Sequence, residues 1–122
     1  MEKPIANAHQ ESLFIFRQTL VVKLANNFDH ITLDTISSQI LQEASRVKRF
    51  KSVIFDLADV NIIDLLDLNA LLETMKAVRL TGARIGLCSI SPGISALIVK
   101  SGLRLPYQAA GHDIEDTIQR MP

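Results

Sequence analysis

The stretch SVIFDLADVNIIDLLDL, residues 52–68, decides the fold class predicted for this chain. Its first part, Ser52–Leu57, carries apolar residues in succession rather than in alternation, which is typical of a strand covered on both faces. From Leu65 to Arg79 the apolar residues instead recur every three or four positions, as on one face of a helix. Asp64 precedes this helix and is placed to cap it. A buried strand followed by an amphipathic helix predicts an α/β domain.

Similar patterns flank this unit on both sides. Upstream, Ser12–Phe16 and Thr19–Leu24 predict a hairpin of two strands, and Thr32 is the expected cap of a helix that reaches Val47. Downstream, the pattern predicts a strand at 84–90, a helix at 91–101, a short edge strand at 103–107 and a final short helix holding Ile114 and Ile118. The expected fold is a mixed, mainly parallel sheet with an antiparallel hairpin at its N-terminal edge and about four helices.

Length and composition fit one globular domain. The chain has 122 residues, 48% of them hydrophobic, so we expect a loose arm at 1–11 and one domain at 12–122. Thirteen basic and 13 acidic residues give no net charge, which disfavours a nucleic-acid partner. No apolar run approaches the roughly 20 residues that cross a bilayer, and the start, Met1-Glu2-Lys3-Pro4, lacks the apolar core of a signal peptide. We therefore expect a soluble cytoplasmic protein with no direct membrane insertion.

Few residues carry the patterns of catalysis or cofactor binding. The five glycines are scattered and fit no nucleotide fingerprint, and no cysteine or histidine pair has metal-ligand spacing. Cys88, the single cysteine, lies in the middle of a predicted strand, where a buried thiol is expected. We expect no cofactor and no metal.

One concentration of acids leaves two interpretations open. Asp56 ends a predicted strand, Asp59 lies in the following loop, and Asp64 and Asp67 begin the next helix. Carboxylates that converge at the C-terminal edge of a parallel sheet can bind a metal or act as acid and base. Alternatively, Asp64 caps the helix, Asp67 interacts with its dipole, and Asp59 belongs to a turn.

The stretch Val53–Asp64 resembles the strand-and-loop signature of STAS domains, which occur in anti-sigma-factor antagonists and at the C-terminus of anion transporters. The stretch from Ala77 to Ile94 is similar to the scaffold proteins of the bacterial stressosome, which carry a Val-Arg-Leu-x-Gly-Ala helix end. The resemblance implies a non-enzymatic module of signal transduction that works by partner switching. Its implied partners are other STAS-domain proteins, a Ser/Thr kinase or a sigma-factor regulator, in a homo- or hetero-oligomer.

The chain departs from the family at the switch position. Family members carry a phosphorylatable Ser or Thr directly after the motif aspartate, whereas here Asp64 is followed by Leu65 and Leu66. The resemblance implies a partner-binding or switch loop made of Asp59, Asp64, Leu65, Leu66 and Asp67. Adjacent helix positions point about 100° apart, so one of the two leucines is expected to be partly exposed. The alternative is that both tuck under the loop.

Three functions follow from these observations. The first is a non-catalytic stressosome scaffold or anti-sigma-factor antagonist that lacks the usual phosphorylation site. The second is a stand-alone STAS accessory subunit of a membrane transport system. The third is a small enzyme that uses the four clustered acids, with or without a divalent metal.

Overall fold

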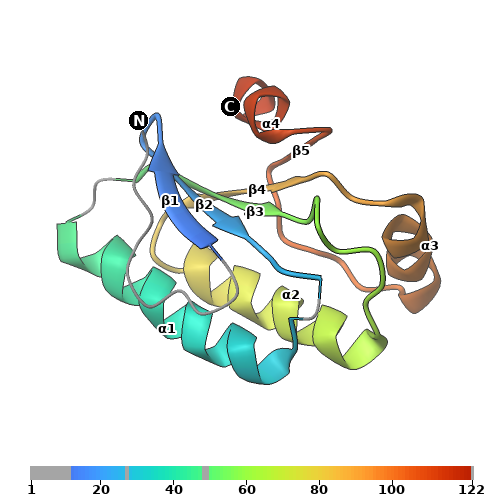
Figure 1. The fold of residues 1–122 in the computed structure, drawn as a ribbon. Coiled ribbons are helices and arrows are strands. Elements are labelled where there is room, and N and C mark those ends of the chain that lie inside the picture. Colours follow the sequence, from blue (N-terminus) through green and yellow to red (C-terminus); the bar gives the residue numbers. More distant parts are fainter. Residues whose placement is uncertain (1–11, 27, 48–49, 122) are drawn as a thin grey trace.

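Strands and helices alternate after an opening pair of strands (Figure 1). The computed structural model describes residues 12–26, 28–47 and 50–121, so the arm expected at 1–11 lies outside the described residues. The elements are β1 (Ser12–Phe16), β2 (Thr19–Lys23), α1 (His30–Val47), β3 (Ser52–Asp56), α2 (Leu65–Arg79), β4 (Arg84–Cys88), α3 (Pro92–Ser101), β5 (Ala109–Gly111) and α4 (Ile114–Arg120).

The five strands form one sheet in the order β1-β2-β3-β4-β5. The β1–β2 pair is antiparallel and every later pair is parallel, as predicted. Arg17 and Gln18 form the two-residue hairpin turn with φ of 51° and 63°. Two successive positive φ angles give the turn a twist that matches the flanking strands. The Arg17 guanidinium lies 4.7 Å from the centre of the Phe16 ring.

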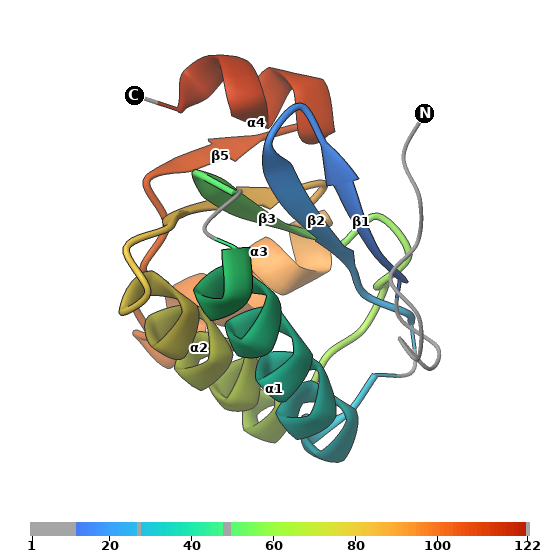
Figure 2. The same cartoon turned by 90° about the vertical axis from the view of Figure 1, so that its left-hand side faces the viewer.

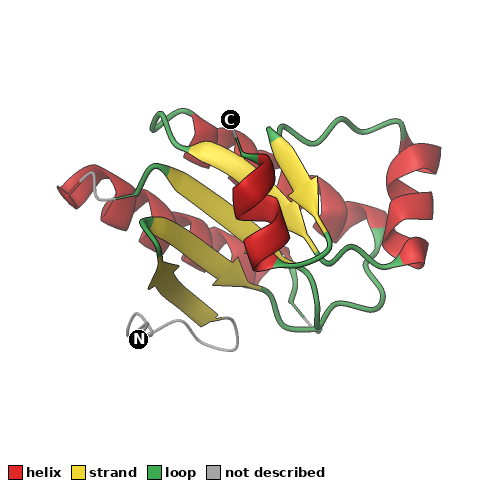
Figure 3. Cartoon of the chain, turned by 90° about the horizontal axis from the view of Figure 1, so that it is seen from above, coloured by secondary structure: helices red, strands yellow, loops and turns green. Residues whose placement is uncertain are grey.

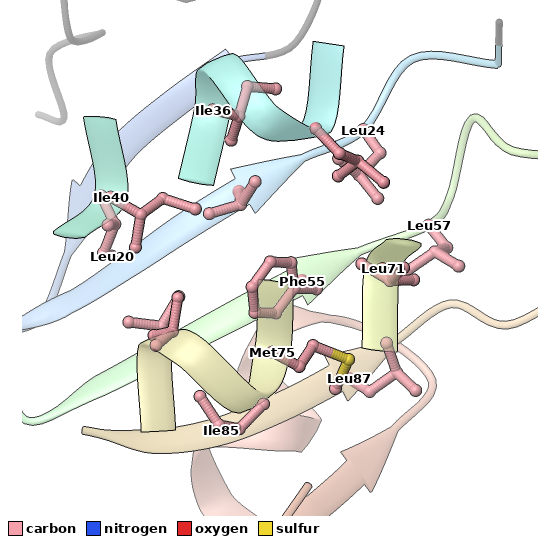
Figure 4. Close-up of a cluster of buried hydrophobic side chains, with 14 of the residues drawn as sticks. Leu20, Leu24, Ile36, Ile40, Phe55, Leu57, Leu71, Met75, Ile85 and Leu87 are labelled. Atoms are coloured by element: carbon pink, nitrogen blue, oxygen red, sulfur yellow. The ribbon is translucent and has the colours of Figure 1, made fainter. Parts of the chain in front are cut away.

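One face of the sheet is covered by α1 and α2, which lie side by side beneath it (Figures 1 and 2). Phe55 projects from β3 into this layer and is fully buried. Figure 4 shows Phe55 near Met75 and Leu71 of α2, with Ile36 and Ile40 of α1 against the β2 side. Since side chains alternate along a strand, Val53 and Leu57 enter the same layer.

The opposite face of the sheet is covered by α4, which crosses over the strands (Figure 3). Ile54 of β3 faces this side and has no exposure to water. An added Cβ at Gly86 would lie 2.5 to 2.9 Å from side-chain atoms of Met121, Thr117 and Ile54. The absence of a side chain at Gly86 therefore lets α4 approach the sheet closely. Burial of β3 on both faces confirms the prediction from its successive apolar residues.

The N-terminus of α1 differs from the sequence-based prediction. The helix begins at His30, and its cap is Asp29 rather than Thr32. The Thr32 N–H donates to the Asp29 carboxylate at 2.9 Å, and the Asp29 N–H donates to the Thr32 hydroxyl at 3.0 Å. Thr32 is thus the inner partner of a reciprocal capping pair, and the pattern did not resolve which of the two polar residues lies outside the helix. The Thr32 backbone and hydroxyl donors lower the pKa of Asp29.

The fifth strand also lies elsewhere than predicted. It is Ala109–Gly111, not 103–107, and it pairs with β4 from Gly86 to Cys88. Within 103–107, Pro106 has no N–H to donate, and the Tyr107 N–H donates locally to the Leu105 carbonyl at 3.0 Å. Gln108 makes the first bonds to β4, exchanging hydrogen bonds with Ile85 through its N–H and its side-chain oxygen.

Other element boundaries agree with the sequence to within one or two residues, and the Ser91 side chain caps α3. Among the described residues, no helix is both long and apolar enough to span a bilayer.

We predict opposite effects for two glycine substitutions. Gly86→Ala should lower the free energy of unfolding by about 1–3 kcal/mol, because its Cβ would overpack the α4 contact. Gly93→Ala is the matched control: nothing lies within 4 Å of its added Cβ, and alanine favours the helix, so stability should stay the same or rise. Urea unfolding measures both. Equal midpoints for Gly86→Ala and the wild type would mean that α4 does not need this close approach.

Candidate functional site

The helix starts and the loops that carry the predicted site lie at the C-terminal edge of the parallel strands. In Figure 1, α1 and α2 both begin near this edge, and α3 lies beyond it. This placement follows from the parallel strands, because each chain segment leaves the sheet at the same edge before its helix begins. Residues of the β3–α2 loop and the first turn of α2 therefore share one end of the molecule.

The β3–α2 loop is held at several points. Val60 is buried, and its N–H donates to the Leu57 carbonyl at 3.0 Å, forming a turn. The Asn61 N–H donates to the side chain of Asn26 at 2.8 Å, which ties this loop to the one that precedes α1. Whereas Val60 is buried in the core, Ile62 is 82% exposed to solvent.

Asp64 caps α2, as predicted. Its carboxylate accepts from the Asp67 N–H at 2.8 Å, and its backbone is extended, as is usual at this position. Asp67 lies in the first turn of α2, where a carboxylate interacts favourably with the helix dipole. Its Oδ1 also accepts from the His30 N–H at 3.1 Å and lies 3.4 Å from Nδ1 of the His30 ring. Asp67 therefore connects the starts of α1 and α2.

The four acids singled out from the sequence have separate partners. Asp56 is buried, and its carboxylate accepts from the Ala58 N–H at 2.9 Å. Asp59 is exposed, and its carboxylate lies 3.9 Å from Nζ of Lys23. In the described ranges, no group of three or more acidic, histidine or cysteine side chains is arranged to hold a metal. The interpretation as a converging acid cluster is therefore wrong for these residues.

Cys88 follows the expectation for a buried thiol. It has no exposure to water, and burial raises its pKa to about 12, with the nearby Asp56 carboxylate adding to the shift. At neutral pH the thiol is protonated, and only the thiolate is an effective nucleophile.

Both leucines at the start of α2 are exposed. Leu65 is 53% and Leu66 is 62% exposed, so the alternative in which both tuck under the loop is wrong. Leu68, one turn further into the helix, is fully buried. We define the loop–helix surface as the exposed apolar residues and the acids around them: Asp59, Ile62, Asp64, Leu65, Leu66 and Asp67.

Ile62 was not among the residues predicted for the site. The pair Ile62-Ile63 gave a partial signal, because two adjacent residues in an extended loop point in opposite directions. Only the fold shows which side is buried: Ile63 packs against the core and Ile62 does not.

Comparisons with known proteins agree with this fold. The model of the STAS domain matches residues 9–119. An anti-sigma F factor antagonist of Paenibacillus polymyxa is 26% identical over 87 residues, which cover 71% of this chain and 74% of that protein.

Solved structures show the same similarity. A variant of RsbS from Moorella thermoacetica has a TM-score of 0.76 at 17% identity, over 91% of this chain and 93% of that one. A chain from the stressosome, described as a signal integration and transduction hub, has a TM-score of 0.74 at 16% identity, over 88% of this chain and 93% of that one. At these identities, the similarity establishes the fold.

We predict that Asp64→Ala lowers the free energy of unfolding by about 1 kcal/mol, because the first turn of α2 loses its side-chain acceptor. Asp59→Ala is the control: it removes a neighbouring carboxylate that forms an exposed ion pair with Lys23, so its effect should be much smaller. Urea denaturation of both variants gives the comparison. A midpoint for Asp64→Ala equal to that of the wild type would remove the capping role.

Proposed function

Since the chain belongs to the STAS domain family, we propose that it is a non-catalytic interaction module that regulates a stress or sigma-factor pathway by binding other proteins. The observation that carries the proposal is the exposure of Leu65 and Leu66 beside the capping Asp64. Covering exposed apolar side chains with a partner is favourable, and two such residues next to each other in the sequence favour an interaction surface. The site we propose is the loop–helix surface.

The chemistry of the described residues supports a binding role rather than catalysis. The acids near the surface are engaged separately, Asp64 with a helix amide and Asp67 with the start of α1. The thiol of Cys88 is buried and protonated. A loop that is held by Val60 and Asn61 presents its exposed side chains in a fixed arrangement, which lowers the entropy cost of binding.

The proposed partners are other STAS-domain proteins, a Ser/Thr kinase or a sigma-factor regulator. Support comes from the relatives, one of which is an anti-sigma F factor antagonist and another a chain of the stressosome. Phosphate added at a helix start brings nearly two negative charges, which would here lie beside Asp64 and Asp67. Because Leu65 has no hydroxyl to phosphorylate, we propose that this surface binds partners without control by phosphorylation at this position.

We predict that a Ser/Thr kinase of the pathway adds no phosphate between Asp64 and Ala70, a stretch that contains no hydroxyl side chain. Leu65→Ser is the matched comparison, because it restores a hydroxyl directly after Asp64. Phosphopeptide mapping after incubation with the kinase distinguishes the two chains. Phosphate at a different residue would show that control exists but has moved. If the wild type lost partner binding on that modification, the proposal of unregulated binding would be wrong.

We predict that the double variant Leu65→Ser/Leu66→Ser keeps the melting midpoint of the wild type and loses partner capture, because both side chains are largely exposed. Leu80→Ser is the control, since Leu80 is 89% exposed at the opposite end of α2. The measurement is affinity capture from native extract followed by mass spectrometry, scored for STAS proteins, Ser/Thr kinases and sigma regulators. Unchanged capture of such a protein by the double variant would contradict the proposed site. Capture of a membrane transporter instead would favour the accessory-subunit alternative.

A further inference from the structure

A second exposed apolar feature lies between α3 and the segment that follows it. A groove of about 450 Å³ runs between these two parts, with Ile98 and Val99 on the α3 side and Leu105 and Tyr107 on the other. Val99 is 80% and Tyr107 45% exposed, so the apolar lining is open to water. The groove shares no residue with the loop–helix surface.

The charged residue that lines the groove is basic, and so is the exposed charged residue on the adjoining turn of α3. Arg104 lines the groove, and Lys100 is exposed on the adjoining turn of α3. Residues 74–112 form an unbroken stretch of the sequence without any aspartate or glutamate, and it contains Lys76, Arg79, Arg84, Lys100 and Arg104. An apolar groove with basic edges fits a partner that presents apolar side chains between carboxylates.

The loop–helix surface has that complementary composition. Its apolar residues are Ile62, Leu65 and Leu66, and they lie beside the exposed carboxylates of Asp59 and Asp64. The Asp59 carboxylate lies 3.9 Å from Nζ of Lys23, and both side chains are exposed, so water weakens this ion pair. One chain thus carries both an acidic apolar surface and a basic apolar groove, while its total charge is zero.

We propose that the groove between α3 and residues 103–107 binds the loop–helix surface of a second copy of this chain. The inference rests on the proposed function of that surface and names one of its partners. The apolar side chains of one copy enter the groove of the other, and the basic residues Lys100 and Arg104 face the carboxylates of Asp59 and Asp64. Each copy holds both halves of the contact, so association either closes reciprocally as a dimer or continues from copy to copy.

The experiment measures the self-association of the full chain by sedimentation velocity over a range of protein and salt concentrations. The wild type should associate, and its Kd should rise with salt because the facing charges are screened. The surface variant Leu65→Ser/Leu66→Ser and the groove variant Val99→Glu should each weaken binding by about tenfold or more, as truncation of an apolar side chain or an introduced charge at a contact does. Leu80→Ser should associate like the wild type.

Mixing the two variants tests whether surface and groove meet each other. The surface variant keeps an intact groove, and the groove variant keeps an intact loop–helix surface. Their equimolar mixture should form a 1:1 pair at concentrations where neither variant associates alone. The pair should stop at two chains, because only one working contact remains. Arg104→Glu provides a second groove variant, and thermal melting checks that every variant is folded.

Several outcomes would overturn the inference. One is a wild type that stays monomeric up to millimolar concentration. Another is a mixture that fails to pair although both single variants are folded, since the surface and the groove would then have other partners. A surface variant that loses the external partner but still self-associates would leave the proposed function standing and reject the self-contact. A surface variant that keeps the external partner but loses self-association would reject the proposed function and keep the self-contact.

Discussion

Phe55 and Ile54 point to opposite faces of β3, and neither has any exposure to water. Each must therefore be covered, which requires one helical layer on either side of the sheet: α1 and α2 over Phe55, and α4 over Ile54 (Figures 3 and 4). Complete burial of such a side chain contributes about 1.5–3 kcal/mol. A strand buried on both faces also needs a neighbour on each edge, and β2 and β4 provide them.

The parallel pairing of these strands places the site. Since β2, β3 and β4 run in the same direction, the segments that leave them emerge at one edge of the sheet. Asp67 then connects the starts of α1 and α2 through His30, and Asn26 receives a hydrogen bond from the β3–α2 loop. These contacts hold the loop and the start of α2, which carry the exposed leucines. Ile62, Leu65 and Leu66 are exposed and take no part in the core.

A chain with zero net charge and exposed apolar residues has little to keep its copies apart in solution. Its charges are nevertheless not mixed evenly: residues 74–112 hold no acid, whereas Asp59, Asp64 and Asp67 lie close together along the chain. Because acidic residues lie on the loop–helix surface and basic residues lie at the α3 groove, each of the two favours a partner of the opposite charge. In the proposed self-contact, selectivity comes from the arrangement of the charges and not from their sum.

The sequence by itself determined the fold class, because the successive apolar residues of 53–55 and the three-to-four spacing from Leu65 to Arg79 are local signals of burial and periodicity. It also identified Asp64 as a cap and Leu65 as a departure from the family pattern. It did not separate Asp29 from Thr32 as the cap of α1, because both side chains take part in one reciprocal pair. Nor did it locate β5, whose pairing depends on Gln108 meeting Ile85 of a distant strand. Only the tertiary structure decided that the four acids have separate partners and that both Leu65 and Leu66 face water, because exposure and convergence depend on which elements pack together in space.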